Sequence, residues 1–347
     1  MDKLYKYLIS GSAQDLFPTE TFFGLLNLNE KDVLEIPKCH PFNGSWGEPV
    51  SLHIMEKGEF PLPIYLDMVY LSLVERKFYS IETEIPSKLI HSLWDKGIHS
   101  PKELGNKYII IGMAPYGGVA VWAYDKKKSH IILWKQAVEV KVSFKEFAPI
   151  TPYHCLDDYC KHYKVKGNKV GQRELPLQCF FDKHMQQFSY RYVLSYDKWD
   201  EDKEEWKKYN EDEIIPEFDY IEEALFDGTH DKLHDGGLMN YHQAGKPKKL
   251  AMKWHIKKQD YTAYFWFEDE EICKVFDRFY GAHPGTKTDF MIRIDAERNK
   301  YELALYRYGL KEPQVINESA YQLLVFKNKF ECYRSENYNQ PKGAWIW

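Results

Sequence analysis

Apolar and polar residues alternate along two parts of the chain, and this pattern predicts two groups of β-strands. In the first group, residues 65–74 and 77–84 place apolar side chains at alternate positions, as in strands with one buried face. Glu75 and Arg76 lie between these strands and predict a tight turn. Further strands of this group are predicted at residues 108–113, 119–124, 130–134 and 138–144.

Each group also contains one predicted amphipathic helix. In the first group, Pro86 suits the first turn of a helix and Gly97 suits its end. The apolar stripe between them consists of Leu89, Ile90, Leu93 and Trp94. In the second group, the acidic residues 269–271 suit a helix N-terminus and Gly281 suits its end. The stripe of that helix consists of Ile272, Val275, Phe276 and Phe279.

The second group repeats the order of the first: a strand, a helix, a strand, a charged turn and a strand. Its strands are predicted at residues 261–267, 289–295, 301–308, 322–326 and 330–333. The predicted fold class is therefore α+β, with two antiparallel-sheet units that each pack one helix. The shared order suggests an internal duplication. Convergence on a common layering is the alternative, because the two copies share little sequence identity.

These groups set the expected domain boundaries. We expect an N-terminal α+β domain at residues 1–147, an irregular, charged connecting region at residues 148–250, and a C-terminal α+β domain at residues 251–347. The first stretch, up to about residue 60, is also expected to be irregular, because prolines interrupt its short apolar clusters.

The connecting region contains a charged tract at residues 197–213, with nine acidic residues and four lysines. The charge of this tract, −5, equals the net charge of the whole chain. Trp199 and Trp206 are seven residues apart and would share one face of a helix. We therefore predict a solvated helix here, docked through its two indoles, with a solvated loop as the alternative.

Composition narrows the class of protein. A net charge of −5 argues against a nucleic-acid partner, because nucleic-acid-binding domains usually carry a basic surface. The longest uncharged stretch, residues 108–124, is too short to span a membrane. The N-terminal residues lack the apolar core of a signal peptide, and the six cysteines are widely spaced. We therefore expect a cytoplasmic protein with reduced thiols and no membrane partner.

Residues 43–147 resemble a known family. The matching features are Gly44–Ser45–Trp46–Gly47, the strand ending at Leu71–Ser72, Lys77–Phe78–Tyr79, the turn at residues 112–118, and Val121–Trp122. The segment is similar to a bacterial family catalogued as domain of unknown function 2931. Many of its members look like exported lipoproteins, but this sequence lacks their signal and acylation motif. Some members look like immunity partners of secreted toxins. The resemblance implies no catalytic residues.

Two clusters carry potential metal-binding chemistry. His154, Cys155, Cys160 and His162 are zinc-type ligands, but a second pair at standard spacing is missing, so packing and capping are their expected roles. We expect no metal and no cofactor.

His230 and His234 form the second cluster. On a helix, their i, i+4 spacing would let both bind one metal, and His–Asp pairs nearby could act in acid–base chemistry. The alternative is a polar loop with Asx-type turns at Asp227–Gly228 and Asp235–Gly236.

Two functions from different classes remain. We expect a non-catalytic protein-binding protein, most concretely an immunity-type inhibitor that occludes a bacterial toxin or effector, because no catalytic constellation assembles. The alternative is a metal-dependent or acid–base hydrolase that uses the region of His230 and His234. The residues expected to contact a protein partner are Trp46, Tyr116, Trp199, Trp206, Asp200, Glu201, Asp202, Trp345 and Trp347.

Overall fold

The computed structural model divides the chain into two compact units. Unit 1 comprises Met1–Met185 and Asp227–Thr229, and unit 2 comprises Gln186–Phe226 and His230–Trp347. This division differs from the expected boundaries at residues 147 and 250. The structure describes residues 3–14, 17–36, 46–49, 58–96, 107–125, 128–165, 168–169, 175–208, 217–234, 240–256, 258–295, 299–310 and 312–339.

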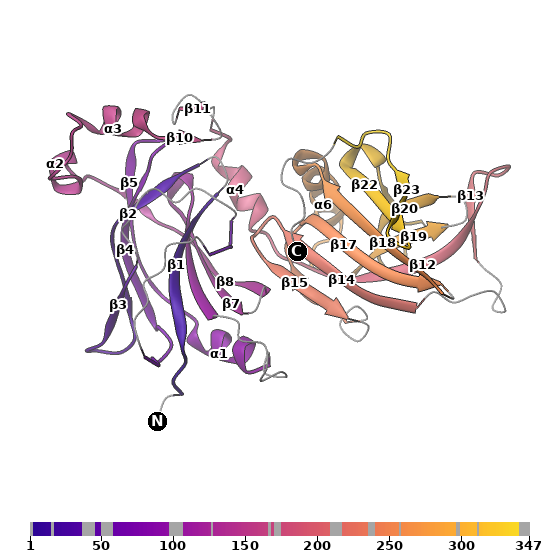
Figure 1. The fold of residues 1–347 in the computed structure, drawn as a ribbon, viewed down its shortest axis with the longest axis horizontal. Helices are drawn as coiled ribbons and strands as arrows, with labels where there is room; N and C mark the ends of the chain where they lie inside the picture. Colours follow the sequence, from indigo (N-terminus) through magenta and orange to yellow (C-terminus); the bar gives the residue numbers. More distant parts are fainter. Residues whose placement is uncertain are drawn as a thin grey trace. The chain divides into compact units, whose positions relative to one another are not determined.

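Unit 1 contains two main β-sheets, drawn in indigo to magenta in Figure 1. Its main strands are β1 (Tyr7–Ala13), β2 (Thr19–Asn27), β3 (Val33–Glu35), β4 (Tyr65–Ser72), β5 (Lys77–Glu84), β6 (Lys107–Met113), β7 (Gly118–Asp125), β8 (Lys128–Gln136) and β9 (Val138–Val140). One sheet has the order β1-β6-β7-β8, in which β1 runs parallel to β6. The other has the antiparallel order β3-β2-β4-β5-β9.

Unit 1 also contains short elements around these sheets. They are the helices α1 (Ser87–Lys96), α2 (Phe144–Phe147), α3 (Leu156–His162) and α4 (Gln178–His184), the 3-10 turn η1 (Pro115–Gly117), and the two-residue strands β10 (Lys164–Val165) and β11 (Asn168–Lys169). Only α1 joins the main core, where Ile90 and Trp94 are buried between side chains of both sheets. Full burial of side chains of this size contributes roughly 1.5–3 kcal/mol each.

Unit 2 is built in the same way. Its strands are β12 (Phe188–Asp200), β13 (Glu205–Lys208), β14 (Glu217–Leu225), β15 (His230–His234), β16 (His242–Ala244), β17 (Pro247–Ile256), β18 (Gln259–Phe267), β19 (Thr288–Asp295), β20 (Lys300–Tyr306), β21 (Gln314–Ile316), β22 (Tyr321–Lys327) and β23 (Phe330–Arg334). One sheet has the order β13-β12-β19-β20-β21, with β12 parallel to β19 and β16 also paired to β12. The other has the antiparallel order β15-β14-β17-β18-β22-β23.

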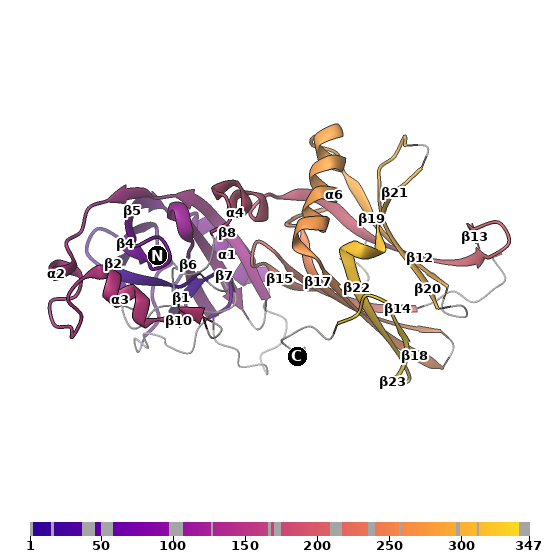
Figure 2. The same ribbon diagram turned by 90° about the horizontal axis from the view of Figure 1, so that it is seen from above.

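One long helix, α6 (Asp269–Ala282), packs in the core of unit 2, and Figure 2 shows it beside the strands of that unit. Its buried residues Ile272, Phe276 and Phe279 meet side chains from both sheets. The 3-10 turn η2 (Glu318–Ala320) precedes β22.

The strand order and direction of the two units correspond. Strands β1, β6, β7 and β8 of unit 1 match β12, β19, β20 and β21 of unit 2, and in each set only the first pair is parallel. Strands β3, β2, β4, β5 and β9 match β15, β14, β17, β18 and β22, all antiparallel. In both units the helix follows the central hairpin, after β5 and after β18.

The structure confirms both predicted helices and most strands of the two groups, and it corrects three expectations. The first stretch is not irregular, because it holds β1, β2 and β3. The region 148–250 is not an irregular connection, because most of its described residues from 188 onward lie in strands of unit 2. The segment 197–208 is a β-hairpin and not a helix. The fold is therefore mostly β, with few helices.

Two glycines allow a close approach of the backbone inside unit 1. Gly47 and Gly228 both have positive φ, +79° and +83°, and a Cβ on Gly47 would lie 2.4 Å from the carbonyl oxygen of Gly228. Asp227 completes the contact, because its carbonyl oxygen accepts a 3.0 Å hydrogen bond from Nε1 of the buried Trp122. The turn at Asp227–Thr229 is thus part of the packing of unit 1.

Among the helices that the structure describes, none combines the length and the apolar character needed to span a membrane.

Candidate functional site

Residues 197–208 of the charged tract form a hairpin that extends from unit 2. Strands β12 and β13 pair Trp199 directly with Trp206, and their rings meet edge to face at a centroid distance of 5.3 Å. The two indoles do share a face, as expected, but across two strands and not along a helix. Figures 1 and 2 both show β13 and the end of β12 reaching beyond the other strands of unit 2.

Two contacts anchor the base of this hairpin. The backbone N–H of Trp199 donates a 2.9 Å hydrogen bond to the carboxylate of Asp295 on β19. The ammonium group of Lys300 lies over the Trp199 ring, 5.0 Å from its centroid. Cation–π contacts of this kind contribute about 0.5–1 kcal/mol at exposed sites. The hairpin therefore has a defined orientation within unit 2.

The tip of the hairpin is acidic and ordered by its own side chains. Asp200 accepts hydrogen bonds from the backbone N–H groups of Asp202 and Lys203, at 3.1 and 3.3 Å. The ion pair of Asp200 with Lys207 lowers the pKa of the Asp200 carboxyl group. The exposed acidic residues of the tip are Glu201, Asp202, Glu204 and Glu205. The tip can therefore present several exposed acidic side chains to a basic surface.

The other expected contact residues lie elsewhere. Trp46 is only 8% exposed and packs edge to face on Trp122, so it belongs to a core and not to a surface. Tyr116 is half-buried in the η1 turn, and its hydroxyl donates a 3.0 Å hydrogen bond to the carbonyl oxygen of Pro176. Trp345 and Trp347 lie outside the described residues. Of the predicted aromatic contacts, the hairpin pair is the one that the structure brings together with the acidic residues.

The first metal-type cluster is dispersed around α3. Cys160 is buried, and burial raises the pKa of its thiol to about 12. His154, Cys155 and His162 are exposed. Among the described residues, none of these four belongs to a group of three ligands whose atoms lie within 4.8 Å of one another. Cys160 packs in a small core of unit 1, whereas Cys155 is the N-cap residue of α3 but its side chain makes no capping hydrogen bond.

His230 and His234 lie on β15, a strand. Four residues along a strand span about 13 Å, so the two side chains cannot share one metal ion as they would on a helix. Within the described residues, neither histidine belongs to a three-ligand group. The predicted turn at Asp227–Gly228 is confirmed, because Asp227 accepts a 2.8 Å hydrogen bond from the N–H of Thr229. The turn predicted at Asp235–Gly236 lies outside the described residues.

Sequence patterns did not indicate a buried carboxylate in unit 2. Glu223 on β14 is 2% exposed and accepts a 2.7 Å hydrogen bond from the hydroxyl of Tyr192 on β12. Nε2 of His242 on β16 lies 3.7 Å from the same carboxylate. Burial alone would lower the pKa of His242, but the polar contact with Glu223 and its negative charge outweigh burial, and the pKa is raised.

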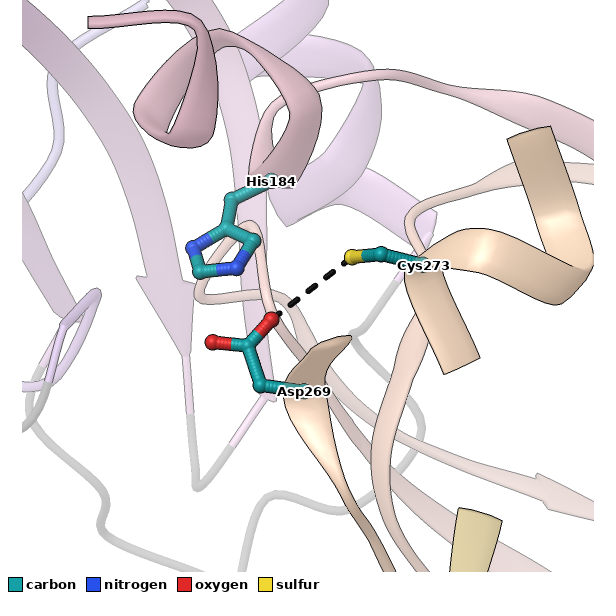
Figure 3. A group of neighbouring side chains, drawn as sticks. All are labelled: His184, Asp269 and Cys273. Carbon is teal, nitrogen blue, oxygen red and sulfur yellow. Dashed lines mark hydrogen bonds between the residues drawn. The ribbon is translucent and has the colours of Figure 1, made fainter. Parts of the chain in front are cut away.

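A thiol and a carboxylate also meet on α6, as Figure 3 shows. Sγ of Cys273 donates a 3.6 Å hydrogen bond to Oδ1 of Asp269, one helical turn earlier. Burial raises the pKa of the Cys273 thiol to about 12. The thiol is therefore protonated at neutral pH, a state that makes a poor nucleophile.

The fold and the candidate site together define a mostly β protein of two similarly built units, with a projecting acidic hairpin. The chain matches the model of a protein family described as "Protein of unknown function (DUF2931)" over residues 32–216, more than half of its length. It therefore belongs to the DUF2931 family. A search of curated proteins and a search of solved structures found no match.

Proposed function

We propose that this protein is a cytoplasmic binding protein that recognises a basic protein partner through the β12–β13 hairpin. An immunity-type inhibitor that occludes a toxin or effector is the most concrete form of this function. The observation that carries the proposal is the hairpin itself, where a contacting indole pair supports a tip with four exposed acidic residues. Tryptophan is enriched among residues that dominate binding energy, and charge complementarity speeds association.

A hydrolase built on His230 and His234 has less support. The two side chains are too far apart along β15 to bind one metal, and the buried thiol of Cys273 is poorly suited to nucleophilic attack. Binding through the acidic hairpin requires no catalytic residue, because it depends only on the shape and charge of the hairpin.

The experiment measures binding of the purified full-length chain to the protein encoded by the adjacent gene, by calorimetry at low and at high salt. The test variant combines Glu201→Lys, Asp202→Lys and Glu204→Lys. The control variant combines Glu270→Lys, Glu312→Lys and Glu336→Lys, which makes the same charge change at exposed positions away from the hairpin.

We expect wild type and the control to bind with similar affinity, and the hairpin variant to bind at least about tenfold more weakly at low salt. The difference should shrink at high salt, because salt screens exposed charges. Equal weakening by both variants, or no binding of the adjacent gene product, would contradict the proposal.

We further propose that the two units arose by internal duplication. The shared strand order supports this, and so do equivalent contacts. The hydroxyl of Tyr7 on β1 donates a 2.8 Å hydrogen bond to the carbonyl oxygen of Pro61, just before β4. The hydroxyl of Tyr190 on β12 donates a 2.8 Å hydrogen bond to the carbonyl oxygen of Gly245, just before β17.

The neighbouring residues agree with the same alignment of the units. A β-bridge joins Tyr5 to Phe60 in unit 1, and the pairing of β12 with β16 joins Phe188 to Ala244 in unit 2. Tyr5 and Phe188 each pack edge to face on an aromatic residue of the core helix of their own unit. Tyr5 meets Trp94 of α1 at 5.4 Å, and Phe188 meets Phe276 of α6 at 5.2 Å.

A further inference from the structure

A cavity of about 470 Å³ opens in unit 1 at the first turn of α1. This volume is within the range of small-molecule sites. Part of its wall is apolar and includes Leu28, Leu62 and Ile64. Ile64 is 50% exposed, so this apolar wall reaches solvent.

Another part of the wall carries basic side chains. It includes Lys3, Lys88 and His91. Asp95 forms an ion pair with Lys3, and Nδ1 of His91 lies 3.0 Å from the same carboxylate. The hydrogen bond with Lys3 lowers the pKa of the Asp95 carboxyl group. One carboxylate therefore faces two bases, and Lys88 adds an exposed positive charge at the mouth.

The corresponding place in unit 2 shows which of these groups are general features of the fold. Asp277 follows Phe276, as Asp95 follows Trp94, and it too pairs with a lysine. There the ammonium group of Lys246 lies 3.0 Å from Asp277 Oδ1. The helix carboxylate and its lysine are thus present in both units, although Lys3 precedes β1 and Lys246 precedes β17. Because this ion pair occurs in both units, we attribute it to the packing of the helix and not to ligand binding.

Lys88 and His91 are different. Lys88 lies six residues before Trp94 in α1, and the residue six before Phe276 in α6 is Glu270. His91 lies three residues before Trp94, and the residue three before Phe276 is Cys273. The charge at the first of these helix positions is therefore opposite in the two units, and at the second position α1 has an imidazole ring where α6 has a thiol. If the two units bind different ligands, we expect their side chains to differ at such equivalent positions.

We propose that this cavity binds a small carboxylate with an apolar chain. The carboxylate lies between the Lys88 ammonium group and the His91 ring, and the chain runs along Leu62 and Ile64. Charge complementarity selects the anion, and the apolar wall adds about 0.8 kcal/mol for each buried methylene group.

The test uses decanoate as the probe, below its micelle concentration, with calorimetry on the full chain. We expect saturable binding to one site, much weaker binding of acetate, and none of decyltrimethylammonium. Lys88→Glu, which introduces the residue type found in unit 2, should weaken decanoate binding at least about tenfold. Ile64→Asp should weaken it to a similar degree, because it places a carboxylate in the apolar wall.

Lys145→Glu is the matched control, because it reverses the charge of another exposed lysine on a helix of unit 1. It should leave the affinity unchanged. The proposal is overturned if decanoate shows no saturable binding, if Lys145→Glu weakens binding as much as Lys88→Glu, or if acetate or decyltrimethylammonium binds as tightly as decanoate.

Discussion

The carboxylate of Glu223 lies among aromatic rings in unit 2, where an isolated charge would be costly. Two groups offset that cost: the hydroxyl of Tyr192, which donates to it, and the ring of His242, whose raised pKa favours the charged form. The three side chains come from β14, β12 and β16. Together they form a buried polar cluster between the two sheets of unit 2.

A pH dependence of stability follows from His242. Because its pKa is raised in the folded state above the ordinary value of 6.5, its contribution is complete below about pH 6.5 and is lost as the pH rises through the raised value. We expect His242→Gln to lower the free energy of unfolding more at pH 5.5 than at pH 8.5, as measured with urea. The exposed His154→Gln serves as the control and should show no such difference. A loss that is equal at both pH values, or larger at pH 8.5, would refute this role for His242.

At the scale of elements, the two core helices could be predicted because each has a regular apolar stripe that follows a proline or acidic residues. The end predicted at Gly281 was wrong by one residue, because α6 continues to Ala282. Strand β1 could not, because nearly all of its residues are buried and the alternation is lost. In β2, a register shift between Thr21 and Phe23 interrupts the alternation. The spacing of Trp199 and Trp206 was ambiguous, because residues seven apart can share a helix face or pair across a hairpin.

The candidate sites, too, could be predicted from the sequence only where their residues lie close together along the chain. The residues of the hairpin were foreseeable from their composition, since the acids and both indoles lie within one short tract. Glu223, Tyr192 and His242 were not, because strand pairing joins only β12 to β16, and the packing of the two sheets then brings β14 against them. The cavity in unit 1 likewise combines residues from distant segments, among them Lys3, Leu28 and His91.

The indole pair of the hairpin supplies the element-scale prediction. Trp206→Ala removes an edge-to-face contact that contributes about 0.5–1.5 kcal/mol beyond its buried area. We expect the circular dichroism couplet of two contacting indoles to disappear, and the hairpin to become more open to proteolysis. Lys203→Ala, at the tip and in contact with neither ring, should preserve both properties. Survival of the couplet in Trp206→Ala would show that this pair is not its source.

At the scale of the whole molecule, the two main cores share no residue. The core of unit 1 draws on residues from Tyr5 to Ala137, and the core of unit 2 on residues from Tyr190 to Val325. Domains with separate cores can unfold as separate cooperative units. The similar build of the two units therefore does not require them to have the same stability.

Calorimetry tests this independence. Trp94→Ala and Phe276→Ala each remove a buried aromatic ring at equivalent helix positions, which typically costs about 3–5 kcal/mol. We expect two unfolding transitions, with Trp94→Ala lowering the midpoint of one and Phe276→Ala lowering the midpoint of the other. A single transition that both variants shift equally would show that the units unfold as one.

The contact between Gly47 and Gly228 has a practical consequence for dividing the chain. A fragment that stops at Met185 would retain the sheets of unit 1 but would lack Asp227, and the indole N–H of Trp122 would lose its acceptor inside a closed core. Such a fragment should be expressed with a short peptide spanning Asp227–Thr229, supplied separately or fused through a linker. Unit 1 is therefore discontinuous in the sequence: the codons for Asp227–Thr229, which belong to unit 1, lie among the codons for unit 2.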